Sequence, residues 1–407
     1  MSKIKYCRNC KSTNLEDILN LGNQDMTGIF PRNISSKISS GNLKLARCQN
    51  CNLVQLKHSF DPNEMYGHNY GYRSSLNSSM VSHLLSKSLK LKQRYKLKKN
   101  DIILDIGSND GTFLSSFDKK YFRIGIDPTI SKFKKYYKDK AITLVEDFFS
   151  SKNYYNKFKK KAKLITSLAM FYDLDDPNDF VANVFEVLDD EGIWHFEQSY
   201  MPMMIETTSY DTICHEHLEY YDLTVIKNIL SKHKLKIIDL ELNSINGGSI
   251  AITAAKQKSK HSSNKVLTNW ILNKEKKLYK DENYFFNFRD KVKKHRKDLK
   301  KIISDLNADN KIVIGYGAST KGNVLLQYCG FTSKEIKLIA EINKDKFNHY
   351  TPGSNIKIVS ESKAKSIKPD YMLVLPWHFR ESIIQREKKF LENKGKLIFP
   401  LPQIEII

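Results

Sequence analysis

Short apolar segments alternate with helix-like segments along the middle of this chain. The apolar segments cover residues 102–106, 122–129, 141–149, 163–174 and 191–201, and apolar residues recur at helical spacing between them. A chain that alternates in this way folds into a parallel sheet covered by helices on both faces. The pattern therefore predicts an α/β fold with a doubly wound, Rossmann-like domain over residues 76–255, whose first helix covers residues 75–91.

A second strand–glycine-loop–helix signal, KIVIGYGASTKGNVLLQYC, begins at residue 311. Further apolar segments at 336–343, 371–379 and 395–402 predict a second, Rossmann-like α/β domain over residues 305–407. Residues 256–304 are polar and charged and contain neither Pro nor Gly. We expect them to form a helical connection between the two domains.

Four of the six cysteines form two Cys-x-x-Cys pairs, Cys7/Cys10 and Cys48/Cys51. Each pair can place two thiolates on one side of a tetrahedral Zn²⁺. Redox pairs are the alternative, but such pairs open a helix after a strand, whereas polar, turn-forming residues fill these two motifs. We therefore predict a zinc-binding domain of short strands and turns over residues 1–75, whose closed site is structural and not catalytic.

The composition limits the class of protein. The chain has 407 residues, a formal net charge of +22 and 11% aromatic residues. The aromatic content argues against disorder, and no apolar run approaches the roughly 20 residues of a membrane span. The N-terminus lacks the apolar core of a secretory signal, so we expect a cytoplasmic protein. The scattered lysines favour a solvated basic surface, and a polyanion-binding site is the alternative.

The first strand of the central domain ends in a glycine loop at residues 105–111, and we expect a helix from Thr112 onward. Its G-x-x-x-G spacing differs from that of a dinucleotide site, and its acidic residues would repel a pyrophosphate. Acidic residues also end the next two strands, where a carboxylate can bind ribose hydroxyls and an aromatic ring can pack on adenine. A glycine turn with capping acids is the alternative to a ligand site. The segments fit S-adenosylmethionine, and its predicted ligands are Asp105, Gly107, Asn109, Asp110, Gly111, Asp127, Asp147 and Phe148.

The segment Cys-His-Glu-His at 214–217 follows the fifth strand, close to the expected carboxyl edge of the sheet. A histidine beside a glutamate is a suitable general base there, because imidazole titrates near neutral pH. The segment does not match the H-E-x-x-H of zincins. Metal binding and structurally buried histidines are the alternatives.

The glycine loop at 315–323 carries a lysine, lacks acids and runs into a helix. It suits a phosphate or diphosphate, which the backbone N–H groups and the helix dipole would bind. It is not a Walker loop, and an ordinary α/β turn is the alternative.

Together, these segments resemble the sugar C-methyltransferases that act on nucleotide-linked keto-deoxysugars. The segments that carry the resemblance are CRNC, CQNCNLVQL, YRSSLNSSM, DIGSNDGTFL, ICHEHLEYY, NGGSIAI, GYGASTKGN, PGSNI and LPWHF. The resemblance implies a zinc-binding domain, an S-adenosylmethionine domain and a C-terminal domain that binds the nucleotide sugar. It also implies that a histidine removes a proton next to the keto group and that the resulting enolate takes the methyl group.

The resemblance assigns roles to particular residues. The implied catalytic residues are His217 as the base, Glu216 and His215 beside it, and Tyr72; the implied substrate-binding residues are Tyr70, Tyr72, Ser319, Lys321 and Asn323. We expect a nucleotide-diphosphate sugar as the substrate, no nucleic-acid or membrane partner, and a monomer or weak oligomer.

Three positions differ from the usual pattern of that family. Cys214 stands for a tyrosine, Phe171 and Tyr172 stand where a histidine is usual, and Asn246 stands for a histidine. Because all three lie near the expected substrate, O- or N-methylation of a related sugar stays an alternative. A zinc-ribbon nucleic-acid-binding protein with a methyltransferase-like core is another alternative. A dehydratase or epimerase is disfavoured, since no G-x-G-x-x-G opens the first βα unit.

Overall fold

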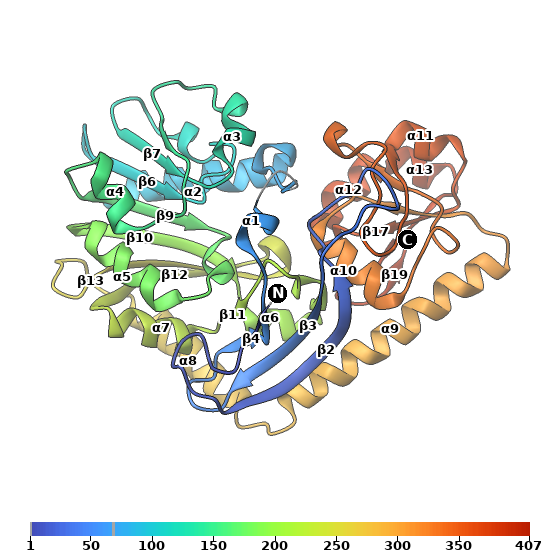
Figure 1. Ribbon diagram of the computed structural model, residues 1–407, viewed down its shortest axis with the longest axis horizontal. Coiled ribbons are helices and arrows are strands. Elements are labelled where there is room, and N and C mark those ends of the chain that lie inside the picture. Colours follow the sequence, from blue (N-terminus) through green and yellow to red (C-terminus); the bar gives the residue numbers. More distant parts are fainter. Residues whose placement is uncertain (1, 67–69) are drawn as a thin grey trace.

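Four β-sheets organise the part of the chain that this computed structural model describes, residues 2–66 and 70–407. The sheet of the central domain and that of the C-terminal domain lie side by side, and the N-terminal strands run between them (Figure 1). The sequence also predicts an aromatic loop, YGHNYGYRSS at residues 66–75, of which 67–69 lie outside the described residues.

A long antiparallel hairpin dominates the N-terminal part. Its sheet has the order β11-β4-β3-β2 and consists of β2 (Leu15–Asp25), β3 (Ser40–Cys48), β4 (Val54–Leu56) and β11 (Glu219–Tyr220). A second small sheet pairs β1 (Ser2–Lys3) with β5 (His58–Ser59), and α1 (Pro62–Met65) follows it. The prediction of short strands is wrong for β2 and β3, because buried and exposed side chains alternate along much of their 11 and 9 residues.

The central sheet has seven strands. Their order is β12 (Leu235–Asn243), β13 (Ser249–Lys256), β10 (Leu188–Ser199), β9 (Ala162–Leu168), β6 (Ile102–Ile106), β7 (Phe122–Ile126) and β8 (Thr143–Val145). The predicted doubly wound arrangement is confirmed, but the sheet is not fully parallel, because β13 runs antiparallel to β10 and β12. A tight connection with Gly247 and Gly248 at positive φ joins β12 to β13, and so short a connection can only join antiparallel strands.

Helices cover both faces of this sheet. One face buries α2 (Ser78–Tyr95), and the other buries α4 (Ser151–Lys157), α5 (Pro177–Val187), α7 (Leu223–Lys232) and α8 (Lys265–Leu278). Two shorter helices, α3 (Ile130–Phe133) and α6 (Met201–Glu206), follow β7 and β10. The predicted helix at 75–91 is confirmed as α2, which Asn77 caps by accepting from the N–H of Ser79 at 2.9 Å.

The prediction of a helix that starts at Thr112 is wrong. Only a 3-10 turn, η2 (Leu114–Ser116), forms there. The Asp110 carboxylate accepts from Thr112 Oγ1 and Ser116 Oγ donates to the carbonyl of Phe113, and such side-chain bonds compete with a continuing helix. The next strand already begins at Phe122, so little chain is left for a longer helix.

The C-terminal sheet has six strands. Their order is β16 (Ile358–Ser360), β15 (Ile339–Glu341), β14 (Val313–Tyr316), β17 (Tyr371–Val374), β18 (Lys396–Phe399) and β19 (Glu405–Ile406). All are parallel except β19, which is antiparallel to β18. The helices of this domain are α10 (Thr320–Cys329), α11 (Glu361–Ser366), α12 (Arg380–Arg386) and α13 (Lys388–Glu392).

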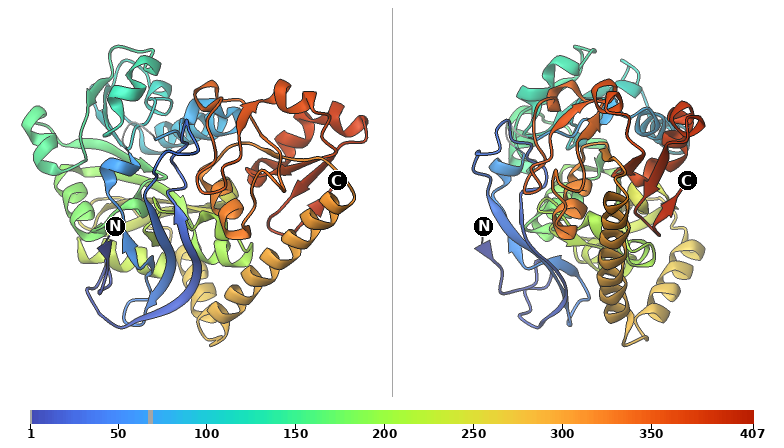
Figure 2. Two further views of the ribbon diagram at one scale, coloured as in Figure 1. Left: turned by 45° about the vertical axis from the view of Figure 1, so that its right-hand side comes forward. Right: turned by 90° about the vertical axis from the view of Figure 1, so that its right-hand side faces the viewer.

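Two helices connect the sheets, as the sequence predicts for the polar segment. The chain leaves the central domain through α8 and then forms the long helix α9 (Tyr284–Ala308), which runs along the outside to the C-terminal domain (Figure 2). No helix among the described residues combines the length and apolarity that a membrane span requires.

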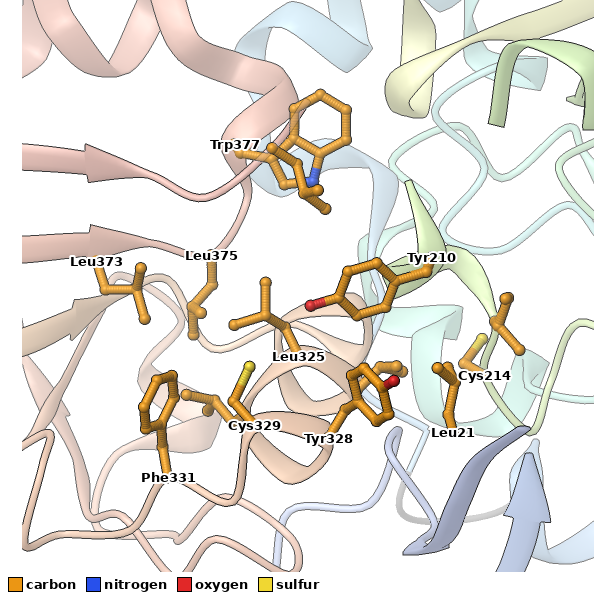
Figure 3. Close-up of a cluster of buried hydrophobic side chains, with 14 of the residues drawn as sticks. Leu21, Tyr210, Cys214, Leu325, Tyr328, Cys329, Phe331, Leu373, Leu375 and Trp377 are labelled. Carbon is orange, nitrogen blue, oxygen red and sulfur yellow. The ribbon is translucent and has the colours of Figure 1, made fainter. Parts of the chain in front are cut away.

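One apolar core joins the three parts of the chain. Figure 3 shows Leu21 of β2, Tyr210 of the short turn η5 (Tyr210–Thr212), and Leu325 and Trp377 of the C-terminal domain in this core. The hydroxyl of Tyr210 also lies 3.0 Å from Nδ1 of His295 on α9. This shared burial fixes the C-terminal domain against residues 201–220 of the central part.

Candidate active site and zinc centre

The four N-terminal cysteines form one cluster, with their Sγ atoms within 4.8 Å of one another. The Sγ atoms of Cys7 and Cys51 are 3.6 Å apart, and those of Cys10 and Cys48 are 3.4 Å apart. Four thiolates at 2.3 Å from a tetrahedral zinc ion lie about 3.8 Å from one another, so the cluster fits the ion with little adjustment.

The same backbone turn builds both halves of this cluster. The N–H of Lys11 donates to the carbonyl of Cys7, and the N–H of Asn52 donates to that of Cys48, both at 2.9 Å. Lys11 and Asn52 both have positive φ, which bends each turn back and leaves its two thiols on one side. Among the described residues, the four cysteines alone make up this group of ligands, so the site is closed, as a structural zinc site requires.

The glycine loop after β6 has a shape that favours close approach of a ligand. Gly107, Asn109 and Gly111 have φ values of 73°, 51° and 75°. A Cβ atom on Gly111 would lie 2.4 Å from the ring of Tyr137, so a side chain at that position would displace the ring. The hydroxyl of Tyr137 donates to the carbonyl of Asn109 at 3.0 Å and fixes the loop at the carboxyl edge of the sheet.

Asp127 follows β7 and holds this loop. Its carboxylate accepts from the N–H of Asn109 at 2.8 Å and from the N–H of Thr129 at 2.6 Å. A carboxylate has about four acceptor sites, so these bonds leave capacity for ribose hydroxyls. The structure therefore adds a second role, ordering of the loop, to the predicted role of Asp127.

Asp147 and Phe148 follow β8 at the same edge. A carboxylate oxygen of Asp147 accepts from Nδ2 of Asn153 at 2.8 Å. The side chain of Phe148 is 46% exposed, which leaves a ring face that an adenine can cover. These features, with the glycine loop and Asp127, fit the methyl donor.

Asp105 and Asp110, two other predicted ligands, are buried beneath the loop. Asp105 accepts from Thr166 Oγ1 at 2.6 Å, and burial raises the pKa of its carboxyl group to about 7. Asp110 accepts from the N–H of Ser75 at 2.9 Å. Asp110 thus connects the glycine loop to the aromatic loop, and its carboxylate accepts hydrogen bonds from groups of the protein itself.

Tyr70 and Tyr72 are two positions apart in the aromatic loop and have different surroundings. The ring of Tyr70 packs between those of Tyr66 and Phe133, and burial, then the carboxylates of Glu216 and other acids, raise the pKa of its hydroxyl. Tyr72 is 49% exposed, and its carbonyl accepts from Nδ2 of Asn109 at 3.2 Å. Tyr70 therefore lies between the donor loop and the histidine segment, and Tyr72 lies against the donor loop.

His217 has one ring nitrogen engaged and one free. Its Nδ1 lies 2.8 Å from the carbonyl of Thr212, which can only accept, so Nδ1 carries the proton and Nε2 carries a lone pair. In the described part of the chain no hydrogen bond involves Nε2. Burial, and then the nearby ammonium of Lys321, lower the pKa of His217 to about 3, so the ring is neutral. Its ring packs on that of Tyr172, with centroids 4.2 Å apart.

Glu216 lies beside His217. Ligand atoms of Cys214, Glu216 and His217 all lie within 4.8 Å of one another. Burial raises the pKa of the Glu216 carboxyl group to about 7, and the ammonium of Lys346 opposes this shift. The carboxyl group is therefore close to half ionised at neutral pH.

The same three side chains offer ligands for a metal ion, but their surroundings do not favour one. The ammonium of Lys321 lowers the pKa of His217, which shows that a positive charge already faces this group. A second cation there would be repelled in a buried environment. We therefore assign the single metal centre to the N-terminal cysteines.

His215 is not brought together with Glu216 and His217. It is 1% exposed, its Nε2 lies 3.2 Å from the carbonyl of Gln24, and its Nδ1 lies 3.3 Å from Thr27 Oγ1. Its ring packs edge-on against Phe60. His215 therefore holds the N-terminal hairpin against the histidine segment, and the expectation that it lies in the catalytic group is wrong.

Lys321 reaches the histidine segment from the C-terminal glycine loop. Its Nζ donates to the carbonyl of Asn246 at 2.7 Å. Burial lowers the pKa of this ammonium, and the carboxylate of Asp211 opposes the shift. Lys321 therefore lies close to the segment that contains Asp211 and His217, and its role in substrate binding stays a prediction.

Ser319 and Asn323 differ in position. Ser319 caps α10 by accepting from the N–H of Gly322 at 3.0 Å, at the loop itself. Asn323 is fully buried, and its Nδ2 donates to the carbonyl of Thr27 at 2.7 Å. Asn323 therefore holds the N-terminal hairpin through Nδ2, and its predicted role in substrate binding stays a prediction.

Two charged groups of this site escaped the sequence analysis. The carboxyl group of Asp173, just after β9, has a pKa raised well above its usual range by burial and by Glu216. Nζ of Lys346 donates to the carbonyl of Ala318 at 2.7 Å and lies 4.2 Å from the ring centroid of Phe30. An acid after the fourth strand was a visible signal for Asp173. Lys346 lies in a lysine-rich segment whose sequence does not differ from that of an ordinary solvent-exposed segment.

Three family models match the chain in order. They are a zinc binding domain at residues 7–66, a methyltransferase domain at 80–240 and a C-methyltransferase C-terminal domain at 244–402. A curated relative, the C-methyltransferase NovU of Streptomyces niveus, is 27% identical over 99% of this chain and 97% of its own length.

Solved methyltransferase structures are similar only to part of the chain. The plantazolicin methyltransferase BpumL has a TM-score of 0.37 at 15% identity, covering 49% of this chain and 92% of its own. The N-methyltransferase NodS from Bradyrhizobium japonicum has a TM-score of 0.33 at 16% identity, covering 45% and 99%. Likenesses of this size carry no argument about the present chain.

The matched segments agree with the geometry. The cysteine cluster lies in the first, the glycine loop and Asp127 lie in the second, and Lys321 lies in the third. Zinc is the structural metal of this protein, and S-adenosylmethionine is its methyl donor. The chain is an S-adenosylmethionine-dependent methyltransferase, and over nearly its whole length it is similar to C-methyltransferases that combine these three domains.

Proposed function

We propose that this enzyme methylates a carbon of a keto-deoxysugar that is linked to a nucleotide diphosphate, and that His217 removes the proton next to the keto group. The observation that carries the proposal is the state of His217. A neutral ring whose Nδ1–H donates to the carbonyl of Thr212 has a lone pair on Nε2, and it lies close to Lys321 of the C-terminal glycine loop.

Glu216 makes His217 a stronger base. With a pKa of about 7, the Glu216 carboxyl group becomes negatively charged as the pH passes neutrality. A negative charge within 4.8 Å favours the protonated form of the ring, which raises its proton affinity at the moment it takes a proton. Tyr172, which packs on the ring, keeps the imidazole oriented.

The donor segments and the histidine segment meet through the aromatic loop. Tyr70 lies close enough to both Asp127 and Glu216 for their charges to act on its hydroxyl. Bound S-adenosylmethionine supplies an activated methyl group at a sulfonium centre. The protein's part is to hold the sugar so that the deprotonated carbon faces that methyl group.

The C-terminal domain supports a diphosphate as the other half of the substrate. In the described part of the chain, the N–H groups of Ser319, Thr320 and Lys321 donate to no protein acceptor at the start of α10. Such free N–H groups at a helix N-terminus bind phosphate oxygens. The ammonium of Lys346, beside the carbonyl of Ala318, adds positive charge to the same loop.

The similarity to NovU supports transfer to carbon over transfer to oxygen or nitrogen. A histidine base would also serve O- or N-methylation, where it would take an O–H or N–H proton, so the choice of carbon rests on this similarity. The proposal includes a small-molecule substrate and no nucleic-acid partner.

Incubation of the enzyme with a labelled methyl donor and a panel of nucleotide-diphosphate 4-keto-6-deoxyhexoses tests the proposal. We expect one sugar to gain the mass of one methyl group, and nuclear magnetic resonance to place that group on a carbon next to the keto group. A methyl group on oxygen or nitrogen, or no gain with any keto sugar of the panel, would contradict it.

A further inference from the structure

His378 lies in the LPWHF segment, which none of the roles above explains. The segment follows β17 and forms a 3-10 turn, η8 (Trp377–Phe379), at the carboxyl edge of the C-terminal sheet. Figure 3 shows Trp377 of this turn at the edge of the apolar core that contains Tyr210 and Cys214. The turn therefore borders the histidine segment.

Several close contacts fix this turn. Nε1 of Trp377 donates to the carboxylate of Asp211 at 2.8 Å. A Cβ atom on Gly247 would lie 3.0 Å from the indole ring, and one on Gly317 would lie 2.8 Å from Pro376. The turn is thus held by the segment next to Cys214, by the β12–β13 connection and by the glycine loop, so His378 has little freedom to move.

The imidazole of His378 has no partner inside the described part of the protein. Its Nδ1 is buried without a hydrogen bond, and no hydrogen bond of the described residues involves Nε2. Its ring packs on that of Phe379, with centroids 4.2 Å apart. Native proteins rarely leave a buried polar atom unpaired, and a ligand that supplies the missing partner is the usual reason.

The ammonium of Lys321 acts on His378 as well as on His217. Burial, and then the ammonium of Lys321, lower the pKa of His378 well below its usual range, so the ring is neutral. The same ammonium acts on His217. Lys321 therefore lies close to both histidines.

We propose that His378 and Lys321 bind the keto oxygen of the sugar and stabilise the enolate that forms on it. This inference rests on the proposed function. As His217 Nε2 takes the proton, the C–H bonding electrons form the carbon–carbon double bond, and the carbonyl π electrons move onto the oxygen. The ammonium of Lys321 and the N–H of a neutral His378 ring then face a full negative charge, and such fixed donors act most strongly on charge that develops in the transition state.

The test measures deuterium exchange at the substrate carbon in D₂O without the methyl donor. The variants are His378→Phe, which cannot donate a hydrogen bond, and His378→Gln, which can. The control is His261→Phe, because His261 lies on the central domain and contacts Tyr95. Melting curves and calorimetry with the nucleoside diphosphate and with S-adenosylmethionine accompany each variant.

We expect His378→Phe to slow exchange on the order of 10²-fold, the typical effect of one lost oxyanion donor, while both affinities stay unchanged. His378→Gln should recover part of the rate, and the control should match the wild type. If His378→Phe exchanges within twofold of the wild type, the inference is overturned and the proposed function stands. If His378→Phe does not fold, His378→Leu, which also cannot donate a hydrogen bond, takes its place, with the same expected result and the same overturning result. A wild-type enzyme that exchanges no keto sugar overturns the proposed function and this inference with it.

Discussion

Gly28 lies directly against Glu216, since a Cβ atom at residue 28 would come within 2.1 Å of Glu216 Oε1. Gly28 belongs to the connection between β2 and β3, at one end of this hairpin. The cysteine cluster lies at the other end of the hairpin. Next to it, the carbonyl of Gln24 and Thr27 Oγ1 contact His215. The zinc-binding domain therefore forms one wall of the candidate active site.

The first prediction concerns this contact. Gly28→Ala should move the Glu216 side chain without unfolding the protein, because the crowded atom is the end of a flexible side chain. A misplaced catalytic group commonly costs one or two orders of magnitude, so we expect deuterium exchange at the substrate carbon to slow at least about tenfold. Adding Gly28→Ala to Glu216→Gln should then have little further effect, because the pair acts through one contact. Fully additive effects would show that Gly28 does not act through Glu216.

The second prediction concerns zinc. Wild-type protein should hold one zinc ion per chain, and Cys48→Ser should lose it. Structural zinc supplies on the order of 10 kcal/mol of folding free energy, so the β2–β3 hairpin should become open to proteolysis. Cys329→Ser is the matched control, because Cys329 is buried in the C-terminal domain far along the chain from the cluster. Metal analysis with two zinc ions per chain, or with none in unchelated protein, would contradict the assignment.

The third prediction concerns the methyl donor. Asp127→Asn keeps the size of the side chain but loses the charge that its bonds to Asn109 N–H and ribose hydroxyls require. Hydrogen bonds to charged groups are worth about 1.5–3 kcal/mol, so donor affinity should fall about tenfold or more. Asp118→Asn, at an exposed aspartate after the glycine loop, is the control. Calorimetry with equal donor affinity in Asp127→Asn and wild type would remove Asp127 from the donor site.

The fourth prediction follows from the raised pKa of Glu216. In the folded protein this pKa is about 7, against 4.5 for an unperturbed glutamate. A raised carboxyl pKa contributes stability that is fully present below pH 4.5 and is lost as the pH rises through 7. Since Gln does not ionise, Glu216→Gln should gain about 1–3 kcal/mol relative to wild type between pH 4.5 and pH 8 in denaturant titrations.

The same ionisation predicts the pH dependence of proton abstraction. Exchange by the wild type should rise with a midpoint near pH 7, and Glu216→Gln should be slower and lose this rise. A stability difference that does not change with pH would show that the Glu216 pKa is ordinary in the folded protein.

Much of the fold could be predicted from local patterns. The buried strands at 102–106 and 122–126 and the Asn77-capped helix α2 follow from apolar spacing and capping, which act over a few residues. The reversed strand β13 and the missing helix after Thr112 depend on a glycine connection and on side-chain bonds to the backbone, which periodicity does not show. The cysteine pairs were the strongest signal, because metal geometry restricts their spacing.

The candidate site was predictable only where a motif marks it. His215, Glu216 and His217 are adjacent in the sequence, but the two histidines have different partners in the folded chain. The ring of His215 contacts Gln24, and that of His217 contacts Thr212. Asn323 carries the polar side chain that a ligand loop favours, yet tertiary packing uses it to hold Thr27. Such assignments depend on which domain covers each side of a segment, and no local pattern contains that information.

The central claim is that His217 removes the substrate proton. The removal of a general base typically lowers the rate about 10²–10⁴-fold, and Asn at position 217 can still donate to the carbonyl of Thr212 from its amide. The decisive measurement is deuterium exchange at the substrate carbon by His217→Asn, without the methyl donor, beside calorimetry of donor binding. The account predicts that exchange falls at least about 100-fold while donor affinity and melting temperature stay at their wild-type values. Exchange at the wild-type rate in His217→Asn would contradict it and place the base elsewhere.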